Sequence, residues 1–96
     1  MTYVVAATWR AKEGEEDAVL RILAEAMPKF RAEPACRMFV AHRSTEDPRA
    51  FLLYEQYDDE AGFHAHVASD AFAAHILGDA VARLETRQRT TYETLD

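Results

Sequence analysis

Three runs of apolar residues along the chain have the composition and length of β-strands. They cover residues 3–11 (YVVAATWRA), 36–43 (CRMFVAHR) and 50–57 (AFLLYEQY), and each is rich in β-branched and aromatic side chains. The turn-forming segment 44–49 (STEDPR) is short enough to join the second and third runs as an antiparallel hairpin. The threonine-rich segment 85–95 predicts a fourth strand.

The intervening segments have helical spacing. Over residues 18–31 the apolar positions recur every three or four residues, at Val19, Ile22, Leu23, Ala26, Met27 and Phe30. Pro28 predicts a kink in the last turn, and Pro34 predicts the end of this helix. A short helix is expected over 60–67 after an acidic start, and Ser69 is expected to cap another over 70 to about 82, interrupted at Gly78.

The order strand, helix, strand, strand, helix, strand is typical of the ferredoxin-like split βαβ fold. This α+β fold has a four-stranded antiparallel sheet with its helices on one face. At 96 residues the chain has the length of a single domain, 1–96.

Both faces of the predicted strands are largely apolar. Phe51, Leu53 and Tyr57 share one face of the third strand, while Leu52 and Tyr54 share the other. Helices can cover only one face, so we expect the second face to pack against another copy in a two-fold homodimer. A monomer with a modestly apolar second face is the alternative.

The charge and the cysteine content narrow the class of protein. The net charge of −6 argues against nucleic acid or an anionic membrane as a partner. The single Cys36 permits no intrachain disulfide, and no apolar stretch approaches the length of a membrane span. With no signal peptide visible, a cytoplasmic location is expected.

The central segment 33–72 resembles the antibiotic biosynthesis monooxygenase (ABM) domain family. The matching pieces are Glu33-Pro34 with Cys36, His42-Arg43-Ser44, Leu53-Tyr54-Glu55, Phe63, Ala65-His66, Ser69 and Phe72. The resemblance implies a dimeric α+β barrel, in which two ferredoxin-like sheets pack face to face. It also implies chemistry ranging from cofactor-independent oxygenation of phenols and hydroquinones to haem degradation and isomerisation. The sequence contains no asparagine, so the asparagine–tryptophan pair of the haem-degrading members is missing.

His66 is the main candidate for catalysis, as base or oxyanion partner. It follows Phe63 by three residues, which places it near the buried stripe of its helix, and it matches the family's motif histidine. The alternative is a half-buried histidine that braces the helix. The spacing of His64 and His66 would suit a metal on a strand, but on a helix the two point apart, so neither a metal nor another cofactor is expected.

Further residues are expected to line a substrate pocket between the sheet and the helices. These are Tyr54, Trp9, Phe72, His75 and His42, each of which could instead be ordinary packing. Glu55 lies on a buried-looking strand and needs a partner, for which Arg87 and Arg89 are candidates. Cys36 is expected to be a packed thiol.

These observations favour a cofactor-independent monooxygenase or quinol oxidase acting on a small aromatic phenol or hydroquinone. Two alternatives remain. One is a non-catalytic dimeric domain that binds a small metabolite or serves in a stress response. The other is an isomerase that needs no oxygen.

Overall fold

A computed structural model describes residues 1–96, and its sheet has the strand order expected of the split βαβ fold. The strands are β1 (Tyr3–Ala11), β2 (Cys36–Arg43), β3 (Ala50–Tyr57) and β4 (Leu84–Glu93). They pair antiparallel in the order β2-β3-β1-β4. The two central strands are therefore the most apolar ones, and the threonine-rich β4 lies at an edge.

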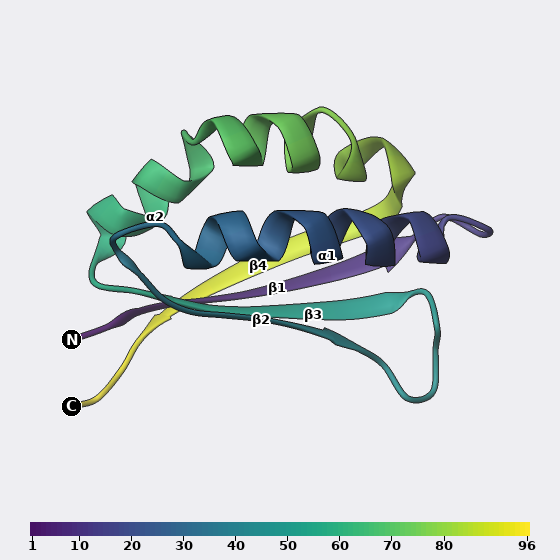
Figure 1. The fold of residues 1–96 in the computed structure, drawn as a ribbon. Coiled ribbons are helices and arrows are strands. Elements are labelled where there is room, and N and C mark those ends of the chain that lie inside the picture. Colours follow the sequence, from purple (N-terminus) through teal and green to yellow (C-terminus); the bar gives the residue numbers. More distant parts are fainter.

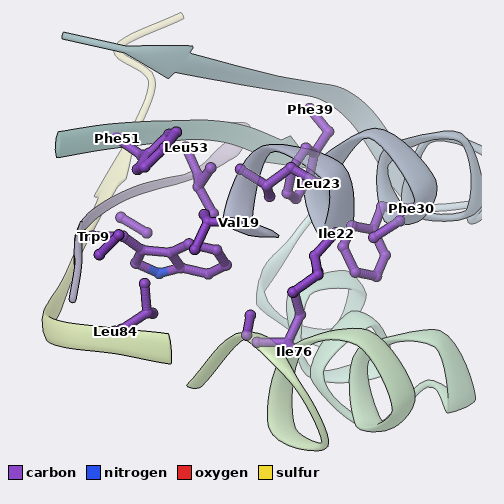
Figure 2. Packing of buried hydrophobic residues seen from close by; sticks show 14 residues of the cluster. Trp9, Val19, Ile22, Leu23, Phe30, Phe39, Phe51, Leu53, Ile76 and Leu84 are labelled. Carbon is purple, nitrogen blue, oxygen red and sulfur yellow. The ribbon is translucent and has the colours of Figure 1, made fainter. Parts of the chain in front are cut away.

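All the helical segments lie on one face of this sheet (Figure 1). They are α1 (Glu16–Arg31), α2 (Glu60–Val67), the π-helix η1 (Phe72–Leu77) and the 3₁₀-helix η2 (Ala80–Arg83). The core between the helices and the sheet is a cluster of 14 buried residues, the larger of which are labelled in Figure 2. Trp9, Phe51 and Leu53 supply its sheet side, while Val19, Ile22 and Phe30 supply its helix side.

The first helix is longer than the apolar spacing predicts. It begins at Glu16, because Glu16 and Asp17 are acidic residues in the first turn, where the helix dipole favours negative charge. It continues through Pro28 and ends at Arg31, three residues before Pro34. Pro34 therefore lies in the connection that leads to β2.

The predicted helix from 70 to about 82 is interrupted at Gly78 as expected, but its two parts are a π-helix and a 3₁₀-helix. Ser69 does cap its start, since the Phe72 N–H donates to Ser69 Oγ at 3.1 Å. The helix then widens into π-turns and ends at Gly78, whose N–H donates to the Ala73 carbonyl five residues earlier at 2.8 Å. A Cβ atom at position 78 would lie 3.0 Å from two carbonyl oxygens, so glycine suits this closure.

The outer ends of β1 and β4 are joined by hydrogen bonds. The Thr2 N–H donates to Thr94 Oγ1 at 2.9 Å, and the Thr94 N–H donates to the Thr2 carbonyl at 3.0 Å. Figure 1 shows both chain ends on the same side of the molecule. None of the helices combines the length and the apolar character needed to cross a membrane.

The sheet face opposite the helices, the open face, carries no secondary structure of this chain (Figure 1). Its side chains include Val4 and Ala6 on β1 and Val40 on β2, together with large apolar groups that are well exposed. The exposed fractions are 41% for Met38, 39% for Leu52 and 54% for Tyr92. The apolar character of both faces predicted from the strands is therefore present in the folded chain.

Candidate functional site

The short helix α2 places His66 in the interior of the molecule. The Asp59 side chain begins the helix by accepting a hydrogen bond from the Gly62 N–H at 2.9 Å. Gly62 allows a close approach, because a Cβ atom there would lie only 2.6 Å from the Ala35 Cβ. One turn further along, His66 is 2% exposed.

Two carboxylates and a phenol surround the imidazole of His66. Its Nδ1 lies 3.0 Å from Glu33 Oε1, and its Nε2 lies 3.8 Å from Glu55 Oε1. The Tyr57 hydroxyl donates to the same Glu55 oxygen at 2.7 Å. Because an ionised carboxylate can only accept, Nδ1 donates to Glu33 and Nε2 is left as the acceptor nitrogen. We call Glu33, Glu55, Tyr57 and His66 the buried proton cluster.

Aromatic rings enclose this cluster. Phe30 and Phe72 meet the imidazole edge to face, with ring centroids 4.5 Å and 5.1 Å away. Tyr57 lies at 5.4 Å on another side of the ring. This apolar enclosure keeps water from the imidazole and penalises its charged form.

The enclosure shifts the pKa values of the cluster in opposite directions. Burial lowers the pKa of His66 to about 4, and the positive charge of Arg89 adds to this. Burial raises the pKa of Glu55 to about 7, although the Tyr57 hydrogen bond and Arg89 oppose the rise. Burial also raises the pKa of Glu33 and of Tyr57. Near neutral pH the imidazole is therefore uncharged, and Glu55 is poised between its two protonation states.

A cavity of about 250 Å³ lies beside this cluster, between η1 and the sheet. We call it the helix-side cavity. Its apolar walls come from Ala7, Trp9, Leu53, Phe72 and Ile76, and its polar edge on β4 comes from Arg87, Gln88 and Arg89. Phe72 and Ile76 reach it together because they lie four residues apart on η1.

Two side chains connect the cavity with the buried proton cluster. Phe72 lines the cavity and packs edge to face on His66. Arg89 also lines the cavity, and its charge lowers the pKa values of both His66 and Glu55. The arrangement combines an apolar pocket, a cationic edge and a proton-holding group, which are the parts that acid–base chemistry on a small molecule requires.

The structure brings only some of the residues predicted for the site to this cavity. Trp9 and Phe72 line it. His66 lies behind Phe72 and does not line the cavity, and both of its ring nitrogens face carboxylates of the chain. Direct contact between His66 and a substrate in this cavity is therefore not what the geometry provides.

Tyr54 and His42 belong to the open face instead. The Tyr54 hydroxyl accepts a hydrogen bond from Gln56 at 2.9 Å, and His42 Nδ1 donates to the Leu52 carbonyl at 3.1 Å. His42 also borders a second hollow of about 570 Å³ on that face. The alternation of side chains along β2 and β3 accounts for both positions, because Leu53 and Phe39 point the other way, into the core.

His75 lies on η1 but outside the cavity. Its Nε2 accepts a hydrogen bond from Lys29 Nζ at 3.0 Å, which links η1 to α1. His64 is exposed, and its Nε2 lies 3.6 Å from Glu60, so it points away from the buried His66. No group of three or more His, Cys, Asp or Glu side chains comes together as a metal site would require.

Glu55 does need a partner, but the predicted ion pair with Arg87 or Arg89 is wrong. Neither arginine comes within ion-pair distance of it, and Tyr57 and His66 take that place. Tyr57 follows Glu55 by two residues on the same face of β3, so strand alternation alone could have identified it. Burial raises the pKa of Cys36, as expected for a packed thiol.

Sequence reasoning missed the role of Glu33. It follows α1 in the connection to β2, and no periodic pattern indicates that its carboxylate turns inward toward α2. The adjacent Pro34 indicates only that Glu33 lies outside the helix, because the residue before a proline is disfavoured in the helical conformation.

Comparisons with known proteins agree on the fold. The family model described as "Antibiotic biosynthesis monooxygenase" matches residues 2–76. No curated protein matches the chain. Among solved structures, PA3566 from Pseudomonas aeruginosa is 24% identical, with 99% of this chain and 95% of that chain covered and a TM-score of 0.92. SO0527 from Shewanella oneidensis is 29% identical, with 97% and 90% covered and a TM-score of 0.89. A structure described as an antibiotic biosynthesis monooxygenase is 24% identical over the full length of both chains, with a TM-score of 0.89.

Proposed function

Because the chain belongs to the antibiotic biosynthesis monooxygenase family, we propose that it is a cofactor-independent monooxygenase or quinol oxidase. Its substrate is a small aromatic phenol or hydroquinone, bound in the helix-side cavity. Family membership itself supports a monooxygenase-type or small-molecule-binding function. The finer assignment depends on the chemistry of the cavity.

The observation that carries the proposal is the combination of an aromatic pocket with a proton-holding group. Trp9 and Phe72 offer flat surfaces on which an aromatic ring can pack. Arg87 and Arg89 form a cationic edge that favours a phenolate over a neutral phenol. Glu55, with a pKa of about 7, can exchange a proton at neutral pH. A domain that only binds an apolar metabolite has no need for such convergence of polar groups.

The reaction draws its electrons from the substrate. Loss of the phenolic proton makes the ring electron-rich enough to reduce dioxygen, and a peroxide forms at a ring carbon. When the O–O bond breaks, one oxygen atom stays on that carbon as the second quinone carbonyl. The other leaves as water with the two hydrogen atoms that the phenol loses. A hydroquinone would instead give its two electrons and two protons to dioxygen, producing quinone and hydrogen peroxide.

In this proposal His66 is a positioning residue. Glu33 fixes the ring by accepting a hydrogen bond from Nδ1–H, which leaves Nε2 facing Glu55. Arg89, whose charge lowers the pKa of both Glu55 and His66, connects the cluster with the cavity. His66 would act on a substrate through Phe72, which packs on the imidazole and lines the cavity.

We further propose that two copies pair through the open face. This pairing is supported by the apolar area around Met38 and Leu52, which no helix or strand of the same chain covers. Face-to-face pairing would complete the dimeric barrel that the family resemblance implies. The single free Cys36 fits a cytoplasmic location.

The test is oxygen consumption by the purified protein with no flavin, haem or metal added. The substrates are dihydroxynaphthalenes and anthrones, and the protein-free rate is subtracted. We expect uptake to fall at least about tenfold in Trp9→Ala, which removes an aromatic wall of the cavity, and in Glu55→Gln, which removes the group that exchanges a proton at neutral pH. Leu20→Ala, on the exposed side of α1, is the matched control and should retain the rate.

Two outcomes would contradict the proposal. Conversion of a substrate at the same rate without oxygen would assign the protein to isomerisation. Tight binding across the panel with no turnover would assign it to metabolite binding.

A further inference from the structure

Two arginines on β4 face the helix-side cavity without an acidic partner. Arg87 lies opposite Trp9 in the sheet, and Arg89 lies opposite Ala7. All four residues line the cavity, so the cationic edge adjoins its apolar floor.

Four of the nine arginines form ion pairs with carboxylates, and five, among them Arg87 and Arg89, do not. Ion pairs hold Arg10, Arg37, Arg49 and Arg83 within 4.0 Å of carboxylates. Neither Arg87 nor Arg89 forms such a pair, although the chain has 17 acidic residues against 11 basic ones. In a chain with this excess of acid, the cavity is a local positive region.

Arg89 is held in position by an aromatic side chain. Its guanidinium carbon lies 4.9 Å from the centroid of the Phe63 ring, a cation–π contact that leaves the N–H groups free for an anion. Arg87 is two residues away on the same face of β4, about 6.6 Å along the strand. Side chains of this length at that spacing can reach one anionic group together.

The size and lining of the cavity limit the rest of the ligand. Its volume of about 250 Å³ is just below the range of about 300–1,000 Å³ that is usual for small-molecule sites. One or two fused rings would therefore fill it. A planar carboxylate matches the flat, two-pronged guanidinium better than a point charge does.

We propose that the ligand of the helix-side cavity is an aromatic carboxylic acid of one or two rings. Its carboxylate is bound by Arg87 and Arg89, and its ring packs against Trp9 and Phe72. The inference rests on the proposed function for the chemistry that follows binding. Binding of the acid itself is a separate property and can be measured separately.

The experiment compares two ligands that differ only in the acid group. Calorimetric titration under anaerobic conditions at pH 7 and low salt uses 1,4-dihydroxy-2-naphthoate and 1,4-dihydroxynaphthalene. We expect the acid to bind at least about tenfold more tightly, which is the lower end of what one charge-assisted hydrogen bond contributes. That preference should shrink as salt is added.

Variants assign the preference to the two arginines. Arg87→Gln and Arg89→Gln should each weaken binding of the acid by about tenfold, while binding of the neutral diol changes less than about twofold. Arg21→Gln, which removes an exposed arginine on α1 far from β4, is the matched control and should leave both affinities unchanged. Thermal unfolding of each variant verifies that it is folded.

Several results would overturn the inference. Equal affinity for the acid and the diol would do so, as would equal losses for both ligands in the arginine variants. Tighter binding of 1-naphthyl phosphate than of 1-naphthoate would show that the cavity prefers a phosphate ester to a carboxylate.

Oxygen uptake, measured separately, distinguishes this inference from the proposed function. Preferential binding of the acid without any oxygen uptake would leave the inference intact and refute the oxygenase. Oxygen uptake with neutral diols, together with no preference for the acid, would support the oxygenase and refute the inference.

Discussion

Glu55 and His66 lie within one buried cluster but respond to pH in opposite ways. The folded chain raises the pKa of Glu55 from 4.5 to about 7 and lowers that of His66 from 6.5 to about 4, in both cases mainly by burial. Folding therefore favours a protonated Glu55 and a neutral His66. Stability from Glu55 is present at low pH and is lost as pH rises from about 4.5 to 7. Stability from His66 is lost in the other direction, as pH falls from about 6.5 to 4.

Replacing Glu55 by glutamine should expose this balance. In the wild type, Glu55 lowers the free energy of unfolding as pH rises, and Glu55→Gln removes this effect. Between pH 4.5 and 8, the free energy of unfolding of the variant should therefore rise by about 3 kcal/mol relative to that of the wild type. Denaturant unfolding at both pH values measures the difference. Leu20→Ala, an exposed change of a residue that does not titrate, should show the same difference at both pH values.

If Glu55→Gln and the wild type differed by a constant amount across this range, Glu55 would titrate alike in the folded and unfolded chain. The proton-holding role proposed for it would then have no basis.

Two positions around the site could not be predicted from the sequence alone. Strand alternation placed Tyr54 opposite Leu53, but a strand does not state which of its faces the helices will cover. Once α1 is packed on Phe39 and Leu53, Tyr54 is necessarily on the open face. Glu33 was unpredictable for a different reason, because its inward orientation depends on how α2 packs against the connection before β2.

At the scale of elements, the strands were predictable from their β-branched and aromatic residues, and α2 from the acidic residues at its start. The helix after Ser69 and its interruption at Gly78 were predictable too, but its π-helical form was not, because its apolar residues fit an α-helix and a π-helix equally well. The π-turns are closed by the hydrogen bond from Gly78 to Ala73. They bring Phe72 and Ile76 to the cavity, and π-turns are often found at functional sites.

The packing of α2 depends on the missing side chain of Gly62. In Gly62→Ala the new Cβ would lie 2.6 Å from the Ala35 Cβ, so α2 must shift away from the connection that carries Glu33. We expect a loss of about 1–3 kcal/mol, as is usual for overpacking. Thermal or denaturant unfolding measures it.

The matched control is the double variant Gly62→Ala with Ala35→Gly, which removes the opposing methyl group. It should recover a good part of the loss, beyond the sum of the two single effects. If the effects of the two single substitutions on the free energy of unfolding simply added in the double variant, the contact between positions 35 and 62 would not position α2.

At the scale of the whole molecule, the two faces of the sheet have different roles. The helix side holds the core, the cavity and the buried proton cluster. The open face keeps Met38 and Leu52 about two-fifths exposed. Pairing of two copies through this face would account for that exposure without any further element of the chain.

A charge on the open face should separate the copies. Leu52→Asp would place a carboxylate in an apolar interface, which costs several kcal/mol, so we expect the mass of one chain instead of two by light scattering. Leu20→Asp adds the same charge to α1, on the other side of the molecule, and should leave the mass unchanged. A single-chain mass for the wild type at high micromolar concentration would refute the pairing.

The hydrogen bonds between Thr2 and Thr94 have a consequence for the order of the chain. They hold the start of β1 beside the end of β4. A short linker across this junction would turn these two strands into a hairpin. Opening the chain in the exposed turn at 44–49 would then give the order β3, α2, η1, η2, β4, β1, α1, β2. Every strand would keep its neighbours, so such a circular permutant should form the same sheet.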